Sequence, residues 1–453
     1  MEDNLLELLK SLKLHLYDCE FIDIRIEESQ HTMIQFFQRE FHSFTEEKKI
    51  GAFIRIFTKN RWYYTSTTEI DNLEVELQKL LESSNILLKR EMNDIEYNEN
   101  IINNLSDDYA YLIPKEEKIN FLSKIRECFE NDPLVANPFI AWKDEVLQKY
   151  YINNKGNANS YNKGFSGIIL GYQLREESNI YDGNFIRTCR FFEEFDQLIE
   201  DFKKDFVEAK QFLKVPTIEP GKYITVLSPK ATGIFAHESF GHKSEADFMI
   251  GDDSMLKEWE IGKKVASDIV TIIDSGLDES CTGYCPFDDE GIPASKTYLI
   301  KNGVLTSRLH DTETAKILNE DKTGNGRSIN FEYEPIVRMT CTYVDKGDLT
   351  LEELIKPIEF GYFIKSVKHG SGMSTFTIAV DRAYKIEHGK ITEPVKINIA
   401  TGTVFQTMYD IDGISNEIKI DSMVFGGCGK MNQWPLMVAF GGPYIRVKSL
   451  NLS

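Results

Sequence analysis

The sequence predicts an α+β protein with two domains. We expect an N-terminal α/β domain (1–214) and a C-terminal, mainly antiparallel, strongly twisted and barrel-like β domain (222–453), joined by a linker (215–221). The chain has 453 residues, more than one hydrophobic core usually supports. The prolines and glycine of the linker interrupt the patterns on either side, and strand patterns dominate after it.

The N-terminal part alternates strand patterns with long helical ones. Residues 21–27 and 51–56 are apolar or alternating, which is typical of strands. Three longer, charged segments have helical periodicity: 73–92, 116–130 and 191–214. Residues 151–161 are rich in Asn and Gly, and they predict a flexible surface loop.

The C-terminal part is predicted to consist mostly of strands. Residues 224–227, 336–344 and 374–386 have strand patterns. Turn residues at 301–303 and 387–390 predict hairpins.

Residues 237–242 read His-Glu-Ser-Phe-Gly-His and are the main candidates for a functional site. The common zinc-protease motif H-E-x-x-H has its histidines four apart, on one face of a helix, with the Glu as general base. His237 and His242 are five apart, so an ideal α-helix would separate them by about 140°. A π-bulge would bring them together, and Gly241 would make that distortion less costly. The alternative to a metal site is two surface histidines or two histidines satisfied by other partners.

Cys428 is the candidate for a third ligand. It lies among glycines, where a thiol can project from a turn, and Lys430 nearby would favour the thiolate. Two imidazoles and one thiolate satisfy the three-ligand rule of catalytic zinc, which leaves Glu238 to act on water. A lone Cys is more often a small buried hydrophobe. The rival catalytic use is a nucleophilic Cys428 with a histidine as base, which leaves Glu238 without a role.

These motifs resemble the TldD/PmbA family of metallopeptidases, also called the modulator of DNA gyrase family. The resemblance covers most of 222–447 and is weak before residue 215. It rests on segments in this order: His237 to His242 with Glu245 and Asp247, 287–291, 323–327, 338–340, 428–430 with Gln433, and 442–443.

The resemblance implies an active, TldD-type subunit in which His237, His242 and Cys428 bind Zn²⁺ and Glu238 activates water. The departures from the usual motif are at residues 239–240 and 243–244, and they concern peptide preference more than the metal. The implied fold agrees with the barrel-like domain.

The function expected from this resemblance is zinc-dependent hydrolysis of small or unfolded peptides inside a dimer cavity, with possible processing of modified peptide precursors. The dimer would be a homodimer or a heterodimer with a TldE/PmbA-type subunit. The alternative is a non-hydrolytic metal-binding regulatory or scaffold subunit. Retention of His237, Glu238 and His242 argues against the scaffold.

Composition excludes other classes. The net charge of −20 opposes nucleic-acid binding. No window of eighteen apolar residues predicts a membrane span, and the acidic start does not resemble a signal peptide, so we expect a cytoplasmic protein without membrane contact. The seven scattered cysteines suit reduced thiols.

Four other groups remain weaker candidates. Cys281 and Cys285 lack a second metal-binding pair. The acidic run 288–290 could bind a cation but fits an acidic turn better. The glycine-rich segment 323–327 lacks phosphate-loop spacing and is predicted to be a structural or substrate-facing loop. Glu245 and Asp247 either orient the imidazoles or lie on a solvated helix face.

Overall fold

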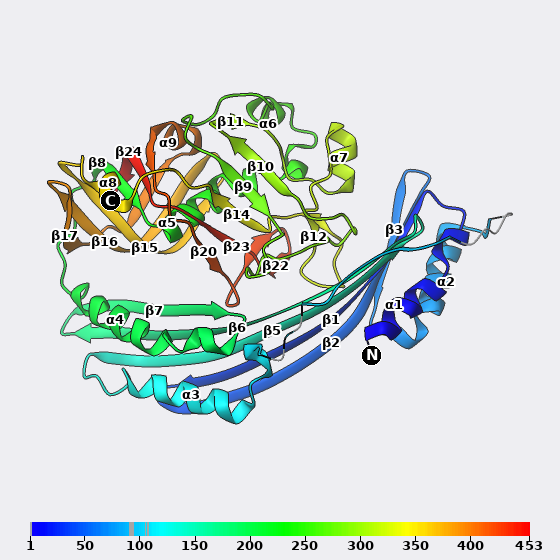
Figure 1. Cartoon of the computed structure of the whole chain (residues 1–453), viewed down its shortest axis with the longest axis horizontal. Helices are drawn as coiled ribbons and strands as arrows, with labels where there is room; N and C mark the ends of the chain where they lie inside the picture. Colours follow the sequence, from blue (N-terminus) through cyan, green and yellow to red (C-terminus); the bar gives the residue numbers. More distant parts are fainter. Residues whose placement is uncertain (1, 90–94, 105, 107) are drawn as a thin grey trace.

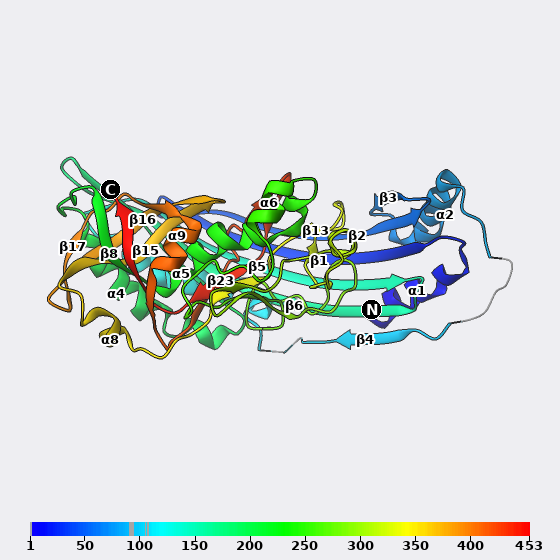
Figure 2. The same ribbon diagram turned by 90° about the horizontal axis from the view of Figure 1, so that it is seen from above.

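The computed structural model describes residues 2–89, 95–104, 106 and 108–453. A long curved sheet forms the N-terminal region (2–211), and a compact β-rich body forms the C-terminal region (221–453) (Figure 1). In both views α1 and α2 lie at one end of the sheet, and the C-terminal region covers the rest (Figures 1 and 2).

Within the described residues, the N-terminal sheet has seven strands in the order β3-β2-β1-β5-β6-β4, with β7 also paired to β6. Its strands are β1 (Phe21–Phe37), β2 (Glu40–Thr58), β3 (Arg61–Thr67), β4 (Asn98–Ile102), β5 (Val135–Asn153), β6 (Asn157–Glu176) and β7 (Asn179–Cys189). Most neighbours are antiparallel, and β4 runs parallel to β6. The strands predicted at 21–27 and 51–56 are confirmed, but they are short parts of much longer strands.

The surface loop predicted at 151–161 is wrong. These residues form the end of β5, a tight turn and the start of β6. Tyr151 and Asn159 are buried, and Asn159 donates to the carbonyl of Gly291 in the C-terminal region at 3.3 Å. The polar composition reflects a strand face that contacts polar groups of the protein and not solvent.

Four helices cover the face of the sheet that the C-terminal region leaves free: α1 (Glu2–Ser11), α2 (Leu73–Ser84), α3 (Lys115–Glu127) and α4 (Leu198–Gln211). Ile22, Ile24 and Ile26 of β1 share a core with α1 and α2, and a second core joins α3 and α4 to β5 and β6. The helix predicted at 73–92 ends early, because Asn85 adopts φ 55°. Residues 90–92 of that prediction lie outside the described residues. The segment 191–214 divides into a 3₁₀ turn (Phe192–Phe195) and α4.

The C-terminal region contains a closed barrel, which confirms the predicted barrel-like fold. Strands β15, β8, β24, β18 and β16 pair in sequence, and β15 pairs again with β16. The strands of this sheet are β8 (Gly221–Leu227), β15 (Phe360–Gly372), β16 (Thr375–Glu387), β17 (Lys390–Val395), β18 (Ile399–Thr403), β19 (Ile411–Ile414) and β24 (Ile445–Leu452). The hairpin predicted at 387–390 joins β16 and β17.

A second sheet of this region has the order β11-β10-β9-β14-β23-β20. Its strands are β9 (Ile272–Ser275), β10 (Lys296–Lys301), β11 (Val304–Leu305), β14 (Cys341–Val344), β20 (Lys419–Ser422) and β23 (Ala439–Gly442). Two ribbons pair β12 (Gly326–Arg327) with β13 (Ile336–Val337) and β21 (Cys428–Lys430) with β22 (Gln433–Leu436). The helices are α5 (Pro229–Phe235), α6 (Asp253–Glu258), α7 (Thr312–Leu318), α8 (Leu351–Ile355) and α9 (Val404–Asp410). The hairpin predicted at 301–303 is confirmed, whereas the strand predicted at 336–344 divides into β13 and β14.

Buried ion pairs hold the two regions together. Arg55 of β2 contacts Asp23 of β1 at 2.9 Å and Glu290 at 2.8 Å, and Lys149 of β5 contacts Asp289 at 2.6 Å. The acidic run 288–290 is therefore a turn whose last two carboxylates are paired with cations of the sheet. Among the described residues, no helix has the length and apolar character needed to cross a membrane.

Candidate metal centre

A π-helix separates the two histidines, as their spacing predicts: His237 lies within it and His242 directly follows it. Ser228 caps α5 by accepting a hydrogen bond from the Ala231 backbone, and the chain then continues into a π-helix over Ala236–Gly241. The wider turn brings the imidazoles of His237 and His242 together, with ring centroids 5.2 Å apart.

Gly241 is required by space rather than by backbone conformation. Its φ of −58° suits any residue, but an added Cβ would lie 2.0 Å from Sδ of Met339. The π-helix therefore packs directly against the strand-and-loop segment that contains Met339.

Cys428 approaches the histidines from the β21–β22 ribbon. Its Sγ lies 3.5 Å from Nε2 of His242, and one ligand atom from each of His237, His242 and Cys428 lies within 4.8 Å of the others. The buried guanidinium of Arg338 donates to the Cys428 carbonyl at 2.7 Å and fixes the ribbon. The structure thus brings together all three residues predicted as ligands.

Glu245 orients His242, which answers one question that the sequence left open. Its carboxylate is fully buried and lies 3.0 Å from Nδ1 of His242, so Nε2 remains directed toward Cys428. Lys430 lies 3.2 Å from Glu245 and 2.7 Å from Asp247. Glu245 is therefore not on a solvated helix face, and Asp247 is connected to Glu245 through Lys430.

The electrostatics of the metal-free site favour a thiolate. Burial raises the pKa of Cys428, but His237 and His242 outweigh this effect and lower the pKa to about 5. Burial lowers the pKa of His242, but Glu245 and Cys428 raise it to about 10. At neutral pH the two side chains therefore form a thiolate–imidazolium pair, and binding of a cation would release the proton of His242.

The donor set fits zinc. In a tetrahedral site with Zn–S near 2.3 Å and Zn–N near 2.0 Å, sulfur and nitrogen ligands lie about 3.5 Å apart. The observed distance between Cys428 and His242 is 3.5 Å. Three protein ligands leave one position for water or substrate, as catalytic zinc requires.

Glu238, like His242, is partly exposed, and β15 lies beside it. A Cβ added at Gly370 would lie 3.0 Å from Cγ of Glu238, and one added at Gly372 would lie 3.2 Å from its carbonyl oxygen. Neither glycine belongs to a motif that predicts the site. Glycines within a strand are typical of close approach, and this signal at 370–372 was available in the sequence.

The weaker candidates do not join this cluster. Sγ of Cys281 lies 3.5 Å from Asp278, and Cys285 donates to the Phe287 carbonyl at 3.1 Å. In the segment 323–327, Asn325 donates to Asp274 at 3.0 Å, and the Gly326 backbone donates to Asp288 at 2.9 Å. These contacts give Asn325 and Gly326 structural roles, whereas Arg327 of the same segment lines a pocket.

Comparisons with known proteins agree with this geometry. The family model described as the PmbA/TldA metallopeptidase C-terminal domain matches residues 220–453, and the model of domain 1 matches 22–85. A metalloprotease of Synechocystis sp. is 28% identical, over 95% of this chain and 94% of its own. The zinc metalloprotease TldD homolog of Saccharolobus solfataricus is 28% identical, over 89% of each chain.

The fold is also that of a solved structure. TldE from Thermococcus kodakarensis superposes with a TM-score of 0.74 at 16% identity, covering 100% of this chain and 99% of its own. The C-terminal family model alone spans more than half of the 453 residues. The chain therefore belongs to the PmbA/TldA metallopeptidase family, which confirms the resemblance to TldD/PmbA proteins.

Proposed function

We propose that this chain is a zinc-dependent peptidase in which His237, His242 and Cys428 bind the metal and Glu238 is the general base. The observation that carries the proposal is the convergence of three ligand atoms within 4.8 Å. His237 comes from the π-helix that also presents Glu238, His242 directly follows that helix, and Cys428 comes from β21. The name of the Saccharolobus relative supports zinc as the metal.

Each side chain has a distinct task in this reaction. When bound, zinc polarises the peptide carbonyl and lowers the pKa of water. Glu238 accepts the proton of the attacking water and returns it to the leaving amine. Glu245 holds Nδ1 of His242 so that Nε2 faces the metal position, and Arg338 holds the backbone of Cys428.

We propose small or unfolded peptides as substrates and a dimer as the working form. The likeness to TldE supports a related partner subunit, either a second copy of this chain or a TldE/PmbA-type chain. Cleavage inside a cavity between subunits would exclude folded proteins. Degradation and precursor processing use the same chemistry, and both fit this site.

The test combines elemental analysis with hydrolysis of an unstructured peptide. Glu238→Gln should keep about one zinc per chain and lose about 10²–10⁴-fold in kcat, because it keeps the ligands and removes the base. Cys428→Ser should lose both zinc and turnover. Full activity in Glu238→Gln would remove Glu238 as the base, and a chelator should abolish wild-type cleavage.

One observation favours a second candidate, a cysteine peptidase. The pKa of about 5 for Cys428 and its 3.5 Å distance from His242 also suit a thiolate nucleophile. A metal-free protein with chelator-resistant cleavage would establish this alternative. A zinc-loaded protein that cleaves no peptide would instead indicate the non-hydrolytic regulatory subunit.

A further inference from the structure

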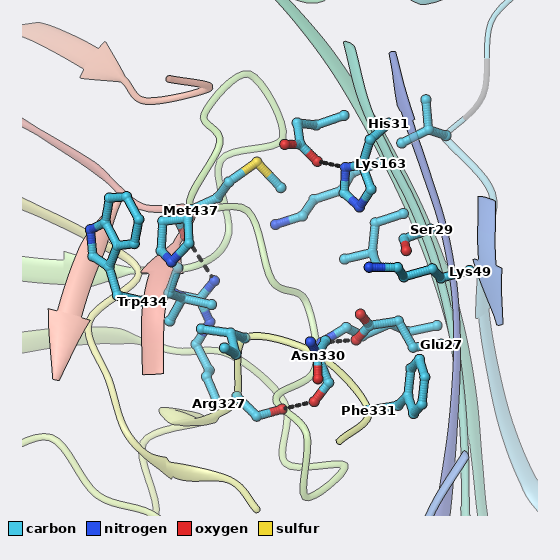
Figure 3. A pocket seen from close by; sticks show the side chains of 18 of the residues that line it. Glu27, Ser29, His31, Lys49, Lys163, Arg327, Asn330, Phe331, Trp434 and Met437 are labelled. Carbon is cyan, nitrogen blue, oxygen red and sulfur yellow. Dashed lines mark hydrogen bonds and ion pairs between the residues drawn. The ribbon is translucent and has the colours of Figure 1, made fainter. Parts of the chain in front are cut away.

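A pocket lies beside the metal centre, between the two regions of the molecule. Its volume is about 280 Å³. One wall comes from the N-terminal sheet, with Glu27 and Lys163 among its residues, and the other comes from the C-terminal region, with Arg327 and Trp434 (Figure 3).

The β21–β22 ribbon connects this pocket to the metal centre. Leu436 lines the pocket and is the cross-strand partner of Cys428. Such partners have Cα atoms about 5 Å apart, and each residue of an extended peptide spans about 3.3–3.6 Å. A peptide held at Cys428 would therefore need only a few residues to reach the pocket.

Two buried cations of this pocket lack a carboxylate partner within ion-pair distance among the described residues. Lys163 and Arg327 are each 4% exposed. Lys163 donates to the carbonyls of Thr282 at 3.0 Å and Tyr284 at 2.7 Å. Arg327 donates to the carbonyl of Met339 and, at 3.1 Å, to that of Met437.

The carboxylates near these cations are already paired with other groups. Glu27 lies 3.2 Å from Lys149, and Glu145 is paired with His31 and Lys143. Asp289 is paired with Lys149 at 2.6 Å and lies 3.5 Å from Arg25. The positive charge of Lys163 and Arg327 is thus not neutralised by a direct ion pair.

This arrangement is costly unless an anion enters. Burial and the neighbouring charge of Arg327 lower the pKa of Lys163 to about 7. Buried charges are normally paired, and these two lie in a protein whose net charge is −20. Lys has three donor hydrogens and Arg has five, so both side chains keep donors free after their carbonyl contacts.

We infer that the pocket between Lys163 and Arg327 binds a carboxylate of the peptide substrate, either an acidic side chain or the C-terminal carboxylate. This inference rests on the proposed peptidase function and names a substrate class for it. A carboxylate matches the guanidinium geometry of Arg327 and would neutralise the charge that the two cations share.

Binding of four fluorescent peptides tests the inference. The peptides share one sequence with either Glu or Gln near the expected cleavage position, and each has a free or an amidated C-terminus. Fluorescence anisotropy with zinc-loaded Glu238→Gln measures their affinities without cleavage. We expect about tenfold or tighter binding for the matching carboxylate, because charge-assisted hydrogen bonds are stronger than neutral ones.

Lys163→Met in the same background removes one cation. The ratio of the affinities for the carboxylate peptide and its neutral counterpart should then fall toward one. Lys48→Met is the matched control, because adjacent residues of a strand face opposite sides and Lys49 is the one that lines the pocket. The control should keep the full preference. If Lys163→Met fails to fold, the binding of the four peptides to the unaltered pocket still tests whether the protein prefers a carboxylate.

Each outcome has a distinct meaning. Preference for Glu over Gln identifies a side-chain site, and preference for the free C-terminus identifies a terminal-carboxylate site. Equal binding of all four peptides, or no binding of any, overturns the inference, and a preference that survives Lys163→Met overturns its location. Cleavage by the wild type is measured separately: preference without cleavage contradicts the proposed peptidase, and cleavage without preference contradicts only the carboxylate pocket.

Discussion

Two buried lysines, one at the metal centre and one at the neighbouring pocket, show how differently the same side chain is used in two regions of this molecule. Lys430 contacts Glu245 at 3.2 Å, Asp247 at 2.7 Å and the Val337 carbonyl at 2.8 Å. Lys163 contacts only carbonyls at comparable distances.

The difference separates a structural charge from one that is available to a ligand. Lys430 has two carboxylate partners within the protein, and these contacts hold Glu245 against His242 without a ligand. Around Lys163 the charges are not balanced by direct pairing, so an incoming anion would gain the most there. Substitutions that remove each lysine should therefore have different consequences.

The largest expected effect is that of Lys430→Met. It would leave the buried Glu245 and the partly buried Asp247 without the Lys430 cation, and breaking a buried pair costs about 3–5 kcal/mol. Urea unfolding should show this loss, and zinc content should fall as His242 loses its orientation. Lys385→Met removes an exposed ion pair with Glu393 as the control and should cost less than about 1 kcal/mol. Similar losses in both variants would contradict a structural role for Lys430.

A smaller loss is expected from Gly241→Ala, which tests the packing of the metal-centre region. The new methyl group would collide with Met339, and overpacking of this kind costs about 1–3 kcal/mol. Met339→Ala alone and the double variant complete a double-mutant cycle. If the second substitution does not recover part of the stability and zinc content, the collision is not the cause.

Lys163→Met should destabilise the protein less than Lys430→Met does. It leaves the carbonyls of Thr282 and Tyr284 without a donor, at about 1–3 kcal/mol, but strands no buried carboxylate. Urea unfolding without peptide measures this effect. A loss of stability as large as that of Lys430→Met would mean that Lys163 is also structural, which contradicts the difference between the two lysines.

The last expected effect is a pH dependence that belongs to Lys163. Burial and Arg327 lower its pKa from 10.5 to about 7, so between these values the unfolded chain binds more protons than the folded one. Stability contributed by this group therefore rises as pH increases from 7 toward 10. The free energy of unfolding of the wild type, measured without peptide, should therefore rise relative to that of Lys163→Met over this range. A difference that stays constant with pH would contradict the lowered pKa.

The spacing of the motif predicted how His237 and His242 approach each other, whereas Cys428 was joined to them through the family resemblance. His237 and His242 are five positions apart, a separation that a π-helix brings to one side, and the structure has a π-helix over Ala236–Gly241. The barrel was predicted from turn residues such as those at 387–390, where strand ends and loop lengths are encoded locally.

The long strands of the N-terminal sheet were missed for a physical reason. One face of β1 has Ile22, Ile24 and Ile26, while the other face has Asp23 and Arg25, which are buried against the C-terminal region. Charged and Asn-rich faces normally indicate solvent, so their burial depends on partners far away in the sequence. The same limit hides Lys163 and Arg327, whose relation exists only after the two regions have packed together.

The π-helix also relates this site to the more familiar H-E-x-x-H arrangement by a single residue. A turn closed from i to i+5 differs from an α-helical turn by one inserted position, so deletion of one residue between Glu238 and His242 would restore the four-residue spacing. The same deletion would rotate the helical residues that follow it by about 100°, so that Glu245 would no longer face Lys430. The two zinc-protease motifs differ by one residue in spacing, but exchanging one for the other would require new contacts around the histidines.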